Sequence, residues 1–311
     1  MIKFSIVIPL YNKALDIQDT LKSVRKQSHN NFEVILVNDG STDSSLEKIK
    51  GITDKRIHLY NNPHKGVSAA RNFGVSKAST NYIAFLDADD YWHPNHLENL
   101  QQLILEFPTQ QWFSTAYERK HHAFRIRPMQ SPIMNQQKPW KGVIQNYFKN
   151  SLISPLAWTS AVCMKKDFFD ALNGFDLKTS QDTDLWIRAA LKSPLVFSNT
   201  ITARHNLNAK QRISHLHISQ KTYMNLDKYN VYASDNNSLK HYLDLNRYSF
   251  AIQHKLANDI FAFRKYAFGI DPNHLNKKQR FLLKQSPLIL RLLKGIKNVL
   301  ENFGLRLSVF K

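Results

Sequence analysis

The sequence contains only one cysteine, Cys163, among its 311 residues. No disulfide can therefore form within the chain, and a lone thiol is typical of proteins kept in a reducing cytosol. Cys163 lies in the apolar segment 158–164, which predicts a buried strand. A core thiol is therefore a better interpretation of Cys163 than a nucleophile.

Long apolar runs are also absent. No segment approaches the ~18 unbroken apolar residues that cross a bilayer as a helix. The apolar run 4–10 is too short for a signal peptide and is interrupted by Pro9. We therefore expect a cytoplasmic protein.

An acidic surplus is missing as well, since the formal net charge is +19. The positive charge is unevenly placed. Residues 1–100 hold 12 Lys and Arg against 11 Asp and Glu, whereas residues 101–311 hold 31 against 13. The second part of the chain therefore attracts polyanions such as nucleic acid, acidic lipid or nucleotide phosphates.

The first hundred residues alternate between strand and helix patterns. Strands are expected at 4–10, 32–37, 57–60 and 82–86, and helices at 15–24, 44–50 and 66–78. This alternation predicts a parallel sheet with helices on both faces. In such sheets ligands bind beyond the carboxyl ends of the strands, and three polar clusters follow the expected strands here.

One of these clusters contains three carboxylates, Asp87, Asp89 and Asp90, directly after the strand at 82–86. Carboxylates held together repel one another and lose hydration, and a divalent cation would neutralise them. The alternative is a helix N-terminus, because Asp90 and Pro94 precede an apolar-periodic segment and also fit a cap.

Two further positions suit a nucleotide. Asp39 ends the second expected strand, where its carboxylate can accept hydrogen bonds from a base or ribose. Arg71 lies in the first turns of an expected helix, where its guanidinium offers a fork for phosphate. The alternatives are a turn and helix cap at residues 41–43 and a solvated helix face around Arg71.

Four segments together resemble the successive motifs of the family 2 glycosyltransferases. They are Ser5-Ile-Val-Ile-Pro-Leu-Tyr-Asn12, Val37-Asn-Asp-Gly-Ser-Thr-Asp43, Lys65-Gly-Val-Ser-Ala-Ala-Arg-Asn72 and Phe85-Leu-Asp-Ala-Asp-Asp90. The resemblance implies a GT-A fold, an α/β domain with a Rossmann-like, mostly parallel central sheet and helices on both faces. It also implies a nucleotide-sugar donor bound with the help of a DXD motif and Mn²⁺ or Mg²⁺.

The resemblance further implies roles for residues of these motifs. Pro9 and Tyr11 would flank the nucleotide base, and Asp39 would contact it. Arg71 and Asp87 would hold the ribose and diphosphate side of the donor.

Two residues are expected to bind the metal. Asp89 is the second carboxylate of the DXD motif. His205 lies in Ala203-Arg-His-Asn206, which loosely resembles a family segment that closes over the diphosphate. The alternative for His205 is a surface or core histidine with no ligand.

The catalytic base is expected in segment 174–188, which resembles the family's GFD…EDxxLxxR signature. Asp182 holds the place of the catalytic Asp, and Asp184 is the lesser candidate. Gln181 stands where the family usually has Glu. An Asp in the first turn of a helix is also a common cap that the helix dipole favours.

The chain is expected to divide into a catalytic domain at 1–214 and a helical, basic region at 215–311. The catalytic domain would contain a nucleotide-binding half at 1–100 and an acceptor half at 101–214. Residues 286–304 show an amphipathic helical pattern with Lys and Arg on a separate face. Such a helix either contacts an anionic membrane peripherally or packs on the domain.

These features predict an inverting, metal-dependent glycosyltransferase with Asp182 as general base. The expected donor is a UDP-sugar, and the expected acceptor is a hydroxyl of a glycan or lipid-linked precursor in cell-envelope polysaccharide synthesis. One alternative is a sugar nucleotidyltransferase of related fold, although its N-terminal glycine-rich signature is absent. The other is a basic nucleic-acid-binding protein with a vestigial site, but no segment resembles a recognition module, so nucleic acid is not an expected partner.

Overall fold

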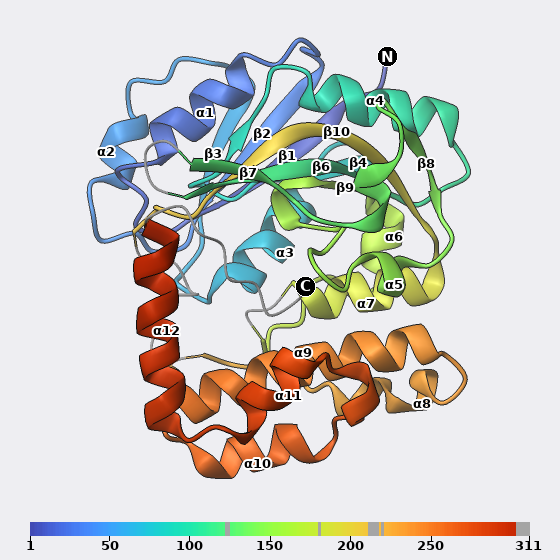
Figure 1. Cartoon of the computed structure of the whole chain (residues 1–311). Helices are drawn as coiled ribbons and strands as arrows, with labels where there is room; N and C mark the ends of the chain where they lie inside the picture. The colour runs from blue at the N-terminus through green and yellow to red at the C-terminus, as the bar shows by residue number, and fades with distance from the viewer. Residues whose placement is uncertain (122–124, 180–181, 211–217, 219–220, 303–311) are drawn as a thin grey trace. The chain divides into compact units, whose positions relative to one another are not determined.

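Figure 1 shows the computed structural model, which describes residues 1–121, 125–179, 182–210, 218 and 221–302. Gln181, the domain boundary expected at 214 and the last residues of the segment 286–304 lie outside these ranges. The described residues form two compact units. The first contains residues 1–147, 154–210 and 221–224, and the second contains residues 148–153 and 225–302.

The first unit is built on one mixed sheet whose first part is parallel. Its strands follow the order β3-β2-β1-β4. They are β1 (Phe4–Leu10), β2 (Phe32–Asn38), β3 (Ile57–Asn61) and β4 (Tyr82–Phe85). These bounds match the strands expected from the sequence. Strands β1 and β2 are almost wholly buried, which is why their sequences are continuous apolar runs.

The sheet continues from β4 through β9, β6, β10 and β5, while β7 pairs with β6 and β8 pairs with β10. The bounds are β5 (Tyr91–Trp92), β6 (Trp112–His121), β7 (Arg125–Pro128), β8 (Lys141–Ile144), β9 (Val162–Lys165) and β10 (Leu195–Asn206). In this second part β6 and β10 are parallel, and the other pairs are antiparallel.

The strand expected over 158–164 is wrong in its first half. Strand β9 begins only at Val162, and Thr159–Ala161 forms a single 3-10 turn, η2. The turn is closed by a hydrogen bond from the Ala161 amide to the Trp158 carbonyl oxygen at 2.7 Å. Cys163 is buried in β9, and burial raises the pKa of its thiol, as expected for a core cysteine.

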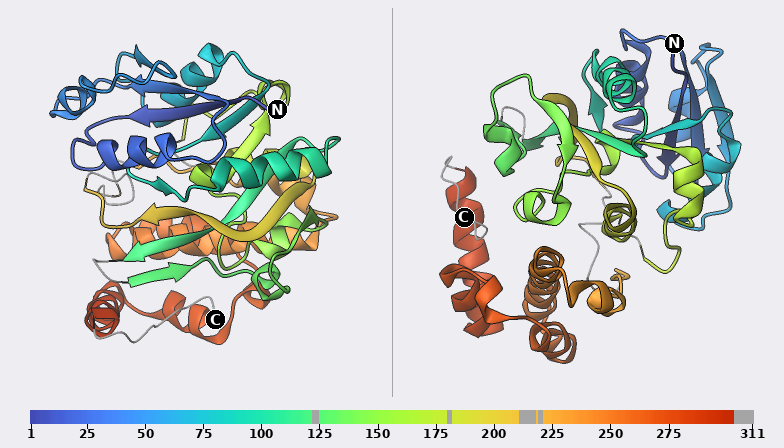
Figure 2. Two further views of the ribbon diagram at one scale, coloured as in Figure 1. Left: turned by 90° about the horizontal axis from the view of Figure 1, so that it is seen from above. Right: turned by 90° about the vertical axis from the view of Figure 1, so that its right-hand side faces the viewer.

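Helices cover both faces of this sheet (Figures 1 and 2). On one face lie α1 (Ile17–Arg25), α2 (Ser45–Ile49) and α4 (His96–Glu106), and on the other lie α3 (Val67–Lys77), α6 (Lys166–Ala171) and α7 (Thr183–Lys192). Short helical segments are η1 (Pro132–Asn135) and α5 (Tyr147–Asn150), and residues 148–150 of α5 belong to the second unit. Helix α3 lies so close to the sheet that a Cβ on Gly74 would be 2.5 Å from Cγ1 of Val7.

The second unit is helical throughout its described part. Its elements are η5 (Asp227–Tyr229), α8 (Asn230–Ala233), α9 (Asn237–Leu256), α10 (Ile260–Phe268), η6 (Pro272–His274), α11 (Lys277–Lys284) and α12 (Pro287–Asn302). Its core is a cluster of Leu245, Tyr248, Ile270 and Leu275. The α11 helix begins with a reciprocal capping box between Asn276 and Gln279.

Helix α12 follows the amphipathic pattern of the sequence over its described residues. Leu290 is buried, and Arg291 Nε donates to the Leu256 carbonyl oxygen at 2.9 Å, so one side of α12 packs on its own unit. Leu288 and Leu292 are exposed. Within the described ranges no helix has both the length and the apolar character needed to span a bilayer.

Candidate active site

Arg71 joins two carboxylates that come from distant parts of the chain. Its Nη2 donates to Oδ1 of Asp87 at 2.6 Å, and its Nη1 donates to Oδ1 of Asp182 at 2.6 Å. The Arg71 side chain is 4% exposed, whereas those of Asp87 and Asp182 are 28% and 25% exposed. Both acids can therefore be reached from solvent while a buried cation neutralises them. The structure thus brings together the predicted base, the first DXD carboxylate and the predicted phosphate-side arginine.

The electrostatics of this triad favour a basic Asp182. Burial raises the pKa of Asp182 above its ordinary range, although the Arg71 charge and the Thr159 hydroxyl act in the opposite direction. Burial alone would lower the pKa of Arg71, but Asp182 and Asp87 raise it above its usual value. Arg71 therefore stays charged, and Asp182 accepts a proton more readily than a free aspartate does.

The local surroundings distinguish Asp182 from Asp184. Asp182 precedes α7, yet within the described part of that helix its carboxylate caps no N–H group. It accepts a hydrogen bond from the Thr159 hydroxyl instead. Asp184 is buried and forms an ion pair with Arg188 at 2.8 Å. Asp184 is therefore committed to packing α7. Asp182 occupies the N-cap position of α7, where the helix dipole favours a carboxylate, and it also contacts Arg71 and Thr159.

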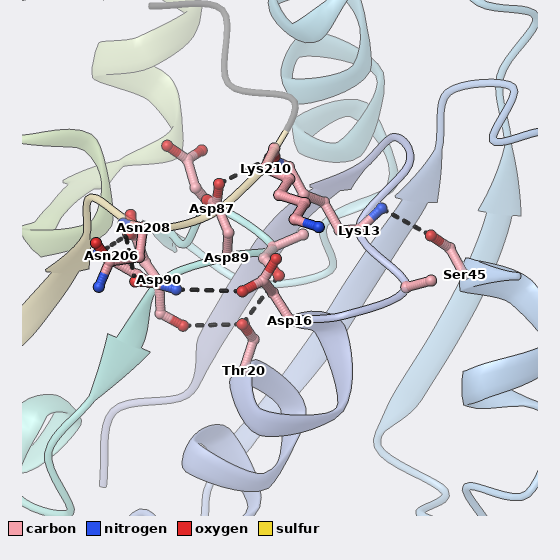
Figure 3. A network of polar contacts seen from close by, with 12 residues as sticks. Lys13, Asp16, Thr20, Ser45, Asp87, Asp89, Asp90, Asn206, Asn208 and Lys210 are labelled. Atoms are coloured by element: carbon pink, nitrogen blue, oxygen red, sulfur yellow. Dashed lines mark hydrogen bonds and ion pairs between the residues drawn. The ribbon is translucent and has the colours of Figure 1, made fainter. Parts of the chain in front are cut away.

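Asp89, the predicted metal ligand, is paired with a cation that the sequence did not suggest. Nζ of Lys13 lies 2.8 Å from Oδ2 of Asp89 and 2.9 Å from the carbonyl oxygen of Lys210 (Figure 3). Lys13 follows β1, Asp89 follows β4 and Lys210 follows β10, so one ammonium group ties three loops together. The Lys13 and Asp89 side chains are only 12% and 11% exposed.

Asp90 is a buried structural acid and not the helix cap that was considered for it. Its Oδ2 accepts from the Ser160 hydroxyl at 2.6 Å, and its Oδ1 accepts from the Asn206 amide at 3.0 Å. Helix α4 begins later and has Asn95 at its cap position. Burial, with the nearby charges of Asp89 and Asp87, raises the pKa of Asp90 well above its ordinary value. Asp90 therefore joins the end of β10 and the η2 turn to the DXD segment.

Asp39 anchors the loop that leads into α3. Its Oδ1 accepts from Asn62 Nδ2 at 2.8 Å and from the Lys65 amide at 3.0 Å, and its Oδ2 accepts from the Gly66 amide at 2.9 Å. Gly66 has φ 89°, a conformation that glycine adopts readily. Asp39 is 3% exposed, so the structure gives it a supporting role for this loop, and a contact with the base remains a prediction.

The remaining nucleotide-side residues lie at the end of β1. Pro9 pairs in register with Val37 of β2. The Tyr11 ring stacks on His64 with centroids 4.5 Å apart and an interplanar angle of 28°. Tyr11 is 40% exposed, so this pair presents an aromatic surface beside the carboxyl ends of the parallel strands, where a base is expected.

His205 lies near the end of β10 with its ring against that of Trp158, at a centroid distance of 4.7 Å. Among the residues that the structure describes, no three His, Cys, Asp or Glu side chains are grouped so as to hold a metal ion. The metal-binding roles of Asp89 and His205 therefore remain predictions.

Sequence reasoning missed four residues that shape this site: Lys13, Thr159, Ser160 and Asn206. Two of them carried a local signal. Lys13 directly follows Tyr11 and Asn12 of the first motif, and Asn206 ends the segment that contains His205. Thr159 and Ser160 reach the carboxylates through the η2 turn, which no local pattern encodes.

Comparison with known proteins identifies the family. Residues 5–169, more than half of the chain, match the model described as Glycosyl transferase family 2. The chain belongs to glycosyl transferase family 2.

Several relatives share part of this chain. It is 39% identical over 103 residues to the Escherichia coli UDP-Glc:alpha-D-GlcNAc-diphosphoundecaprenol beta-1,3-glucosyltransferase WfgD, covering 33% of this chain and 41% of WfgD. It is 40% identical over 106 residues to the putative teichuronic acid biosynthesis glycosyltransferase TuaG of Bacillus subtilis, covering 33% and 42%. An uncharacterized glycosyltransferase of Rickettsia felis is 29% identical over 237 residues, covering 74% of this chain and 35% of the relative. The chain thus spans well under half of the length of these relatives.

Solved structures of S. aureus TarS residues 1–349 share the fold. The complex with UDP-GlcNAc aligns with a TM-score of 0.62 at 19% identity, covering 88% of this chain and 83% of TarS 1–349. Another structure of the same fragment aligns with a TM-score of 0.57 at 17% identity, covering 86% and 90%. At these identities the similarity shows the fold alone, and it confirms the predicted GT-A architecture with a helical C-terminal region.

Proposed function

We propose that this protein is an inverting glycosyltransferase that transfers a sugar from a nucleotide-sugar to an acceptor hydroxyl. The observation that carries the proposal is the Arg71 fork, which holds Asp87 of the DXD motif and Asp182 of segment 174–188 at 2.6 Å each. A donor-side carboxylate and a base are thereby held by one buried group, as a displacement between two bound substrates requires.

Asp182 is the proposed general base. An acceptor oxygen attacks the anomeric carbon from the face opposite the nucleotide, the bond from that carbon to the diphosphate breaks, and Asp182 accepts the hydroxyl proton. The raised pKa of Asp182 suits this role, and its exposed fraction of 25% leaves it accessible to an acceptor. Inversion follows from a single attack on the opposite face.

Asp89, supported by Asp87, would hold Mn²⁺ or Mg²⁺. Their hard oxygen ligands fit, because Mg²⁺ is commonly held by one or two carboxylates and completed by substrate phosphates. Asp87 already pairs with Arg71, and Asp89 with Lys13. Both carboxylates therefore lie where positive charge is stabilised. His205 remains a predicted additional ligand. When bound, the ion would offset the charge that develops on the departing diphosphate.

A UDP-sugar is the proposed donor, supported by the donor named for WfgD and by the UDP-GlcNAc complex of TarS. A glycan or lipid-linked acceptor in cell-envelope polysaccharide synthesis is proposed on the same basis, since WfgD is named for a diphosphoundecaprenol-linked acceptor and TuaG for teichuronic acid biosynthesis.

The proposed location is the cytoplasm, with peripheral contact to an anionic membrane through the segment 286–304. Exposed Leu288 and Leu292 and the basic residues Arg291, Lys294 and Lys297 support this proposal. Deleting residues 286–311 should abolish binding to vesicles that contain phosphatidylglycerol. Unchanged vesicle binding by the truncated protein would contradict this part of the proposal.

The test of the donor site is thermal unfolding with UDP, GDP, dTDP and CMP, each with and without Mn²⁺. A nucleotide at ~100 times its dissociation constant should add about 2.7 kcal/mol to the free energy of unfolding. We expect UDP to act, and the shift to disappear with EDTA and in Asp89→Ala. Stabilisation by nucleoside triphosphates with pyrophosphate release would favour a nucleotidyltransferase. Nucleic-acid binding that falls steeply with salt, without any nucleotide effect on thermal unfolding, would favour the alternative of a nucleic-acid-binding protein.

A further inference from the structure

The end of strand β6 carries a row of basic side chains that continues across two neighbouring strands. In the antiparallel pair with β7, Arg119 lies opposite Arg127 and His121 lies opposite Arg125. In the parallel pair with β10, Arg119 is the register partner of His205. Side chains of register partners share one face of a sheet, so these five residues lie on a common face. All five are partly exposed. We call them the basic face.

The directly opposed guanidinium groups of Arg119 and Arg127 are an unfavourable way to build a hairpin. Like charges on cross-strand partners destabilise the pairing, unless an anion lies on the same face. The carboxylate of the adjacent Glu118 is engaged elsewhere, because it accepts from Arg204 Nε at 2.7 Å and lies 3.1 Å from His93 Nε2. The arrangement on the basic face is therefore of the kind expected at a binding site for an anion.

Aromatic rings connect the basic face to the catalytic carboxylate. The Arg119 guanidinium lies 5.5 Å from the Tyr117 ring centroid, and its Nη2 donates to the Tyr117 hydroxyl at 3.1 Å. The Tyr117 and His205 rings each lie 4.7 Å from that of Trp158. Trp158 immediately precedes Thr159, whose hydroxyl is bonded to Asp182. The basic face is therefore continuous with the acceptor side of the site.

We propose that the basic face binds a phosphate or diphosphate group of the acceptor. Arg119 and Arg127 present guanidinium forks, which match phosphate oxygens in pairs. A group bound there would keep an acceptor hydroxyl close to Asp182, with Trp158 and Tyr117 as an apolar wall between the two ends. The inference rests on the proposed function only in assigning the phosphate to the acceptor, because the cationic arrangement is independent of catalysis.

The test uses geranyl diphosphate, which carries a diphosphate and no nucleoside. Its binding to the full-length protein is measured by isothermal titration, alone and with a saturating amount of the nucleotide chosen by the thermal screen. We expect binding that persists in the presence of nucleotide, and a loss of about tenfold in affinity for Arg119→Gln and for Arg127→Gln, since a hydrogen bond to a charged group contributes about 1.5 kcal/mol or more. Geraniol, which lacks the diphosphate, should not bind.

Lys120→Gln is the matched control. Lys120 is next to Arg119, and the Lys120→Gln substitution removes the same charge. The register partners of Lys120 are Ile126 and Asn206, so its side chain lies on the other face of the hairpin. The affinity of Lys120→Gln for geranyl diphosphate should stay within about twofold of that of the wild type. Melting temperatures check folding, and Arg127→Gln should not lower the melting temperature because it relieves a like-charge pair.

Three results would overturn the proposal. They are failure of the wild type to bind geranyl diphosphate, complete displacement of geranyl diphosphate by the nucleotide, and an equal loss of affinity in Lys120→Gln. None of these three binding results depends on catalytic activity. A protein that binds geranyl diphosphate as expected but shows no nucleotide effect and no transfer would contradict the proposed function alone.

Discussion

The two sides of the sheet in the first unit hold their carboxylates by different means. On the proposed nucleotide side, Asp39 is held by the backbone amides of Lys65 and Gly66 and by Asn62, all within 27 positions of it. On the proposed acceptor side, Asp182 is held by the side chains of Arg71, 111 positions away, and Thr159, 23 positions away. The first arrangement is mostly backbone, and the second is made of side chains, one of which lies 111 positions away in the sequence.

This difference has a consequence for substitution. A backbone amide is present whatever side chain a residue carries, so the Asp39 loop tolerates changes at Lys65. The Asp182 contacts vanish when one side chain is altered. Single substitutions should therefore damage catalysis more than nucleotide binding, and the predictions below test that contrast.

The largest effect is expected for Asp182→Asn. The amide has nearly the same shape but cannot accept the acceptor proton, so turnover should fall by about 10²–10⁴-fold. The affinity for the nucleotide should stay within a few-fold, because the donor-side contacts do not include Asp182. Initial rates and nucleotide titrations on the same preparation measure both quantities. Normal turnover in this variant would show that the base is elsewhere.

The pH dependence of the wild type provides a second test of Asp182. Transfer requires the ionised carboxylate, and burial raises the pKa of Asp182. The acid limb of the kcat profile should therefore lie above the ~3.9 of a free aspartate, with activity lost as the pH falls through the raised pKa. A limb at or below the ordinary aspartate value would show that the acid controlling kcat is not a buried base.

The next effect is expected for Arg71→Met. The change leaves Asp87 and Asp182 without their shared buried cation, so we expect a loss of about 3–5 kcal/mol in the free energy of unfolding. In the Asp182→Asn background, Arg71→Met should lower the free energy of unfolding by clearly less, because only the Asp87 carboxylate is then left without its cation. Urea unfolding of the four proteins of this cycle measures the difference. Additive losses would mean that the 2.6 Å contacts contribute no coupling, and Arg71→Lys serves as a control that keeps the charge but not the fork.

The sequence predicted the nucleotide side in detail because that side is made of consecutive strand–loop–helix units. Tyr11, Asp39 and Asp87 each follow a strand within two positions, so apolar runs located both the strands and the polar clusters at their ends. Asp39 was placed correctly at a strand end, although its actual partners are the backbone amides at residues 65 and 66.

The acceptor side could not be predicted in the same way. The Thr159 and Ser160 hydroxyls serve the site only because residues 159–161 turn before β9, whereas the apolar pattern suggested a strand. The basic face exists only because β6, β7 and β10 pair in one register. Register and turn placement are tertiary outcomes, and a single sequence specifies them through packing between segments as far apart as Arg119 and His205.

A smaller effect, on stability, is expected for Gly74→Ala on the nucleotide side. A Cβ there would lie 2.5 Å from Cγ1 of Val7 and 3.3 Å from Cγ2 of Val37, so α3 or the sheet must shift. We expect a loss of about 1–3 kcal/mol in the free energy of unfolding. Gly295→Ala in α12 is the control, because no atom lies within 4 Å of the added Cβ and the helix should gain about 0.5–1 kcal/mol. Equal effects in the two variants would contradict the close packing of α3 on β1 and β2.

The smallest effect is expected for Lys13→Met, which tests whether the nucleotide side is preset for a metal. Nζ of Lys13 lies 2.8 Å from Oδ2 of Asp89, so the ammonium must leave this carboxylate, or share it, when a divalent cation binds. Removing it should raise the affinity for Mn²⁺ in the absence of nucleotide by about fivefold, the value of an ion pair worth ~1 kcal/mol. Titration of Mn²⁺ followed by electron paramagnetic resonance measures this directly, and Lys13→Arg, which retains the charge, should behave like the wild type. Weaker Mn²⁺ binding in Lys13→Met would instead mean that Lys13 positions Asp89 for the ion, through its second bond to the Lys210 carbonyl oxygen, and does not compete with it.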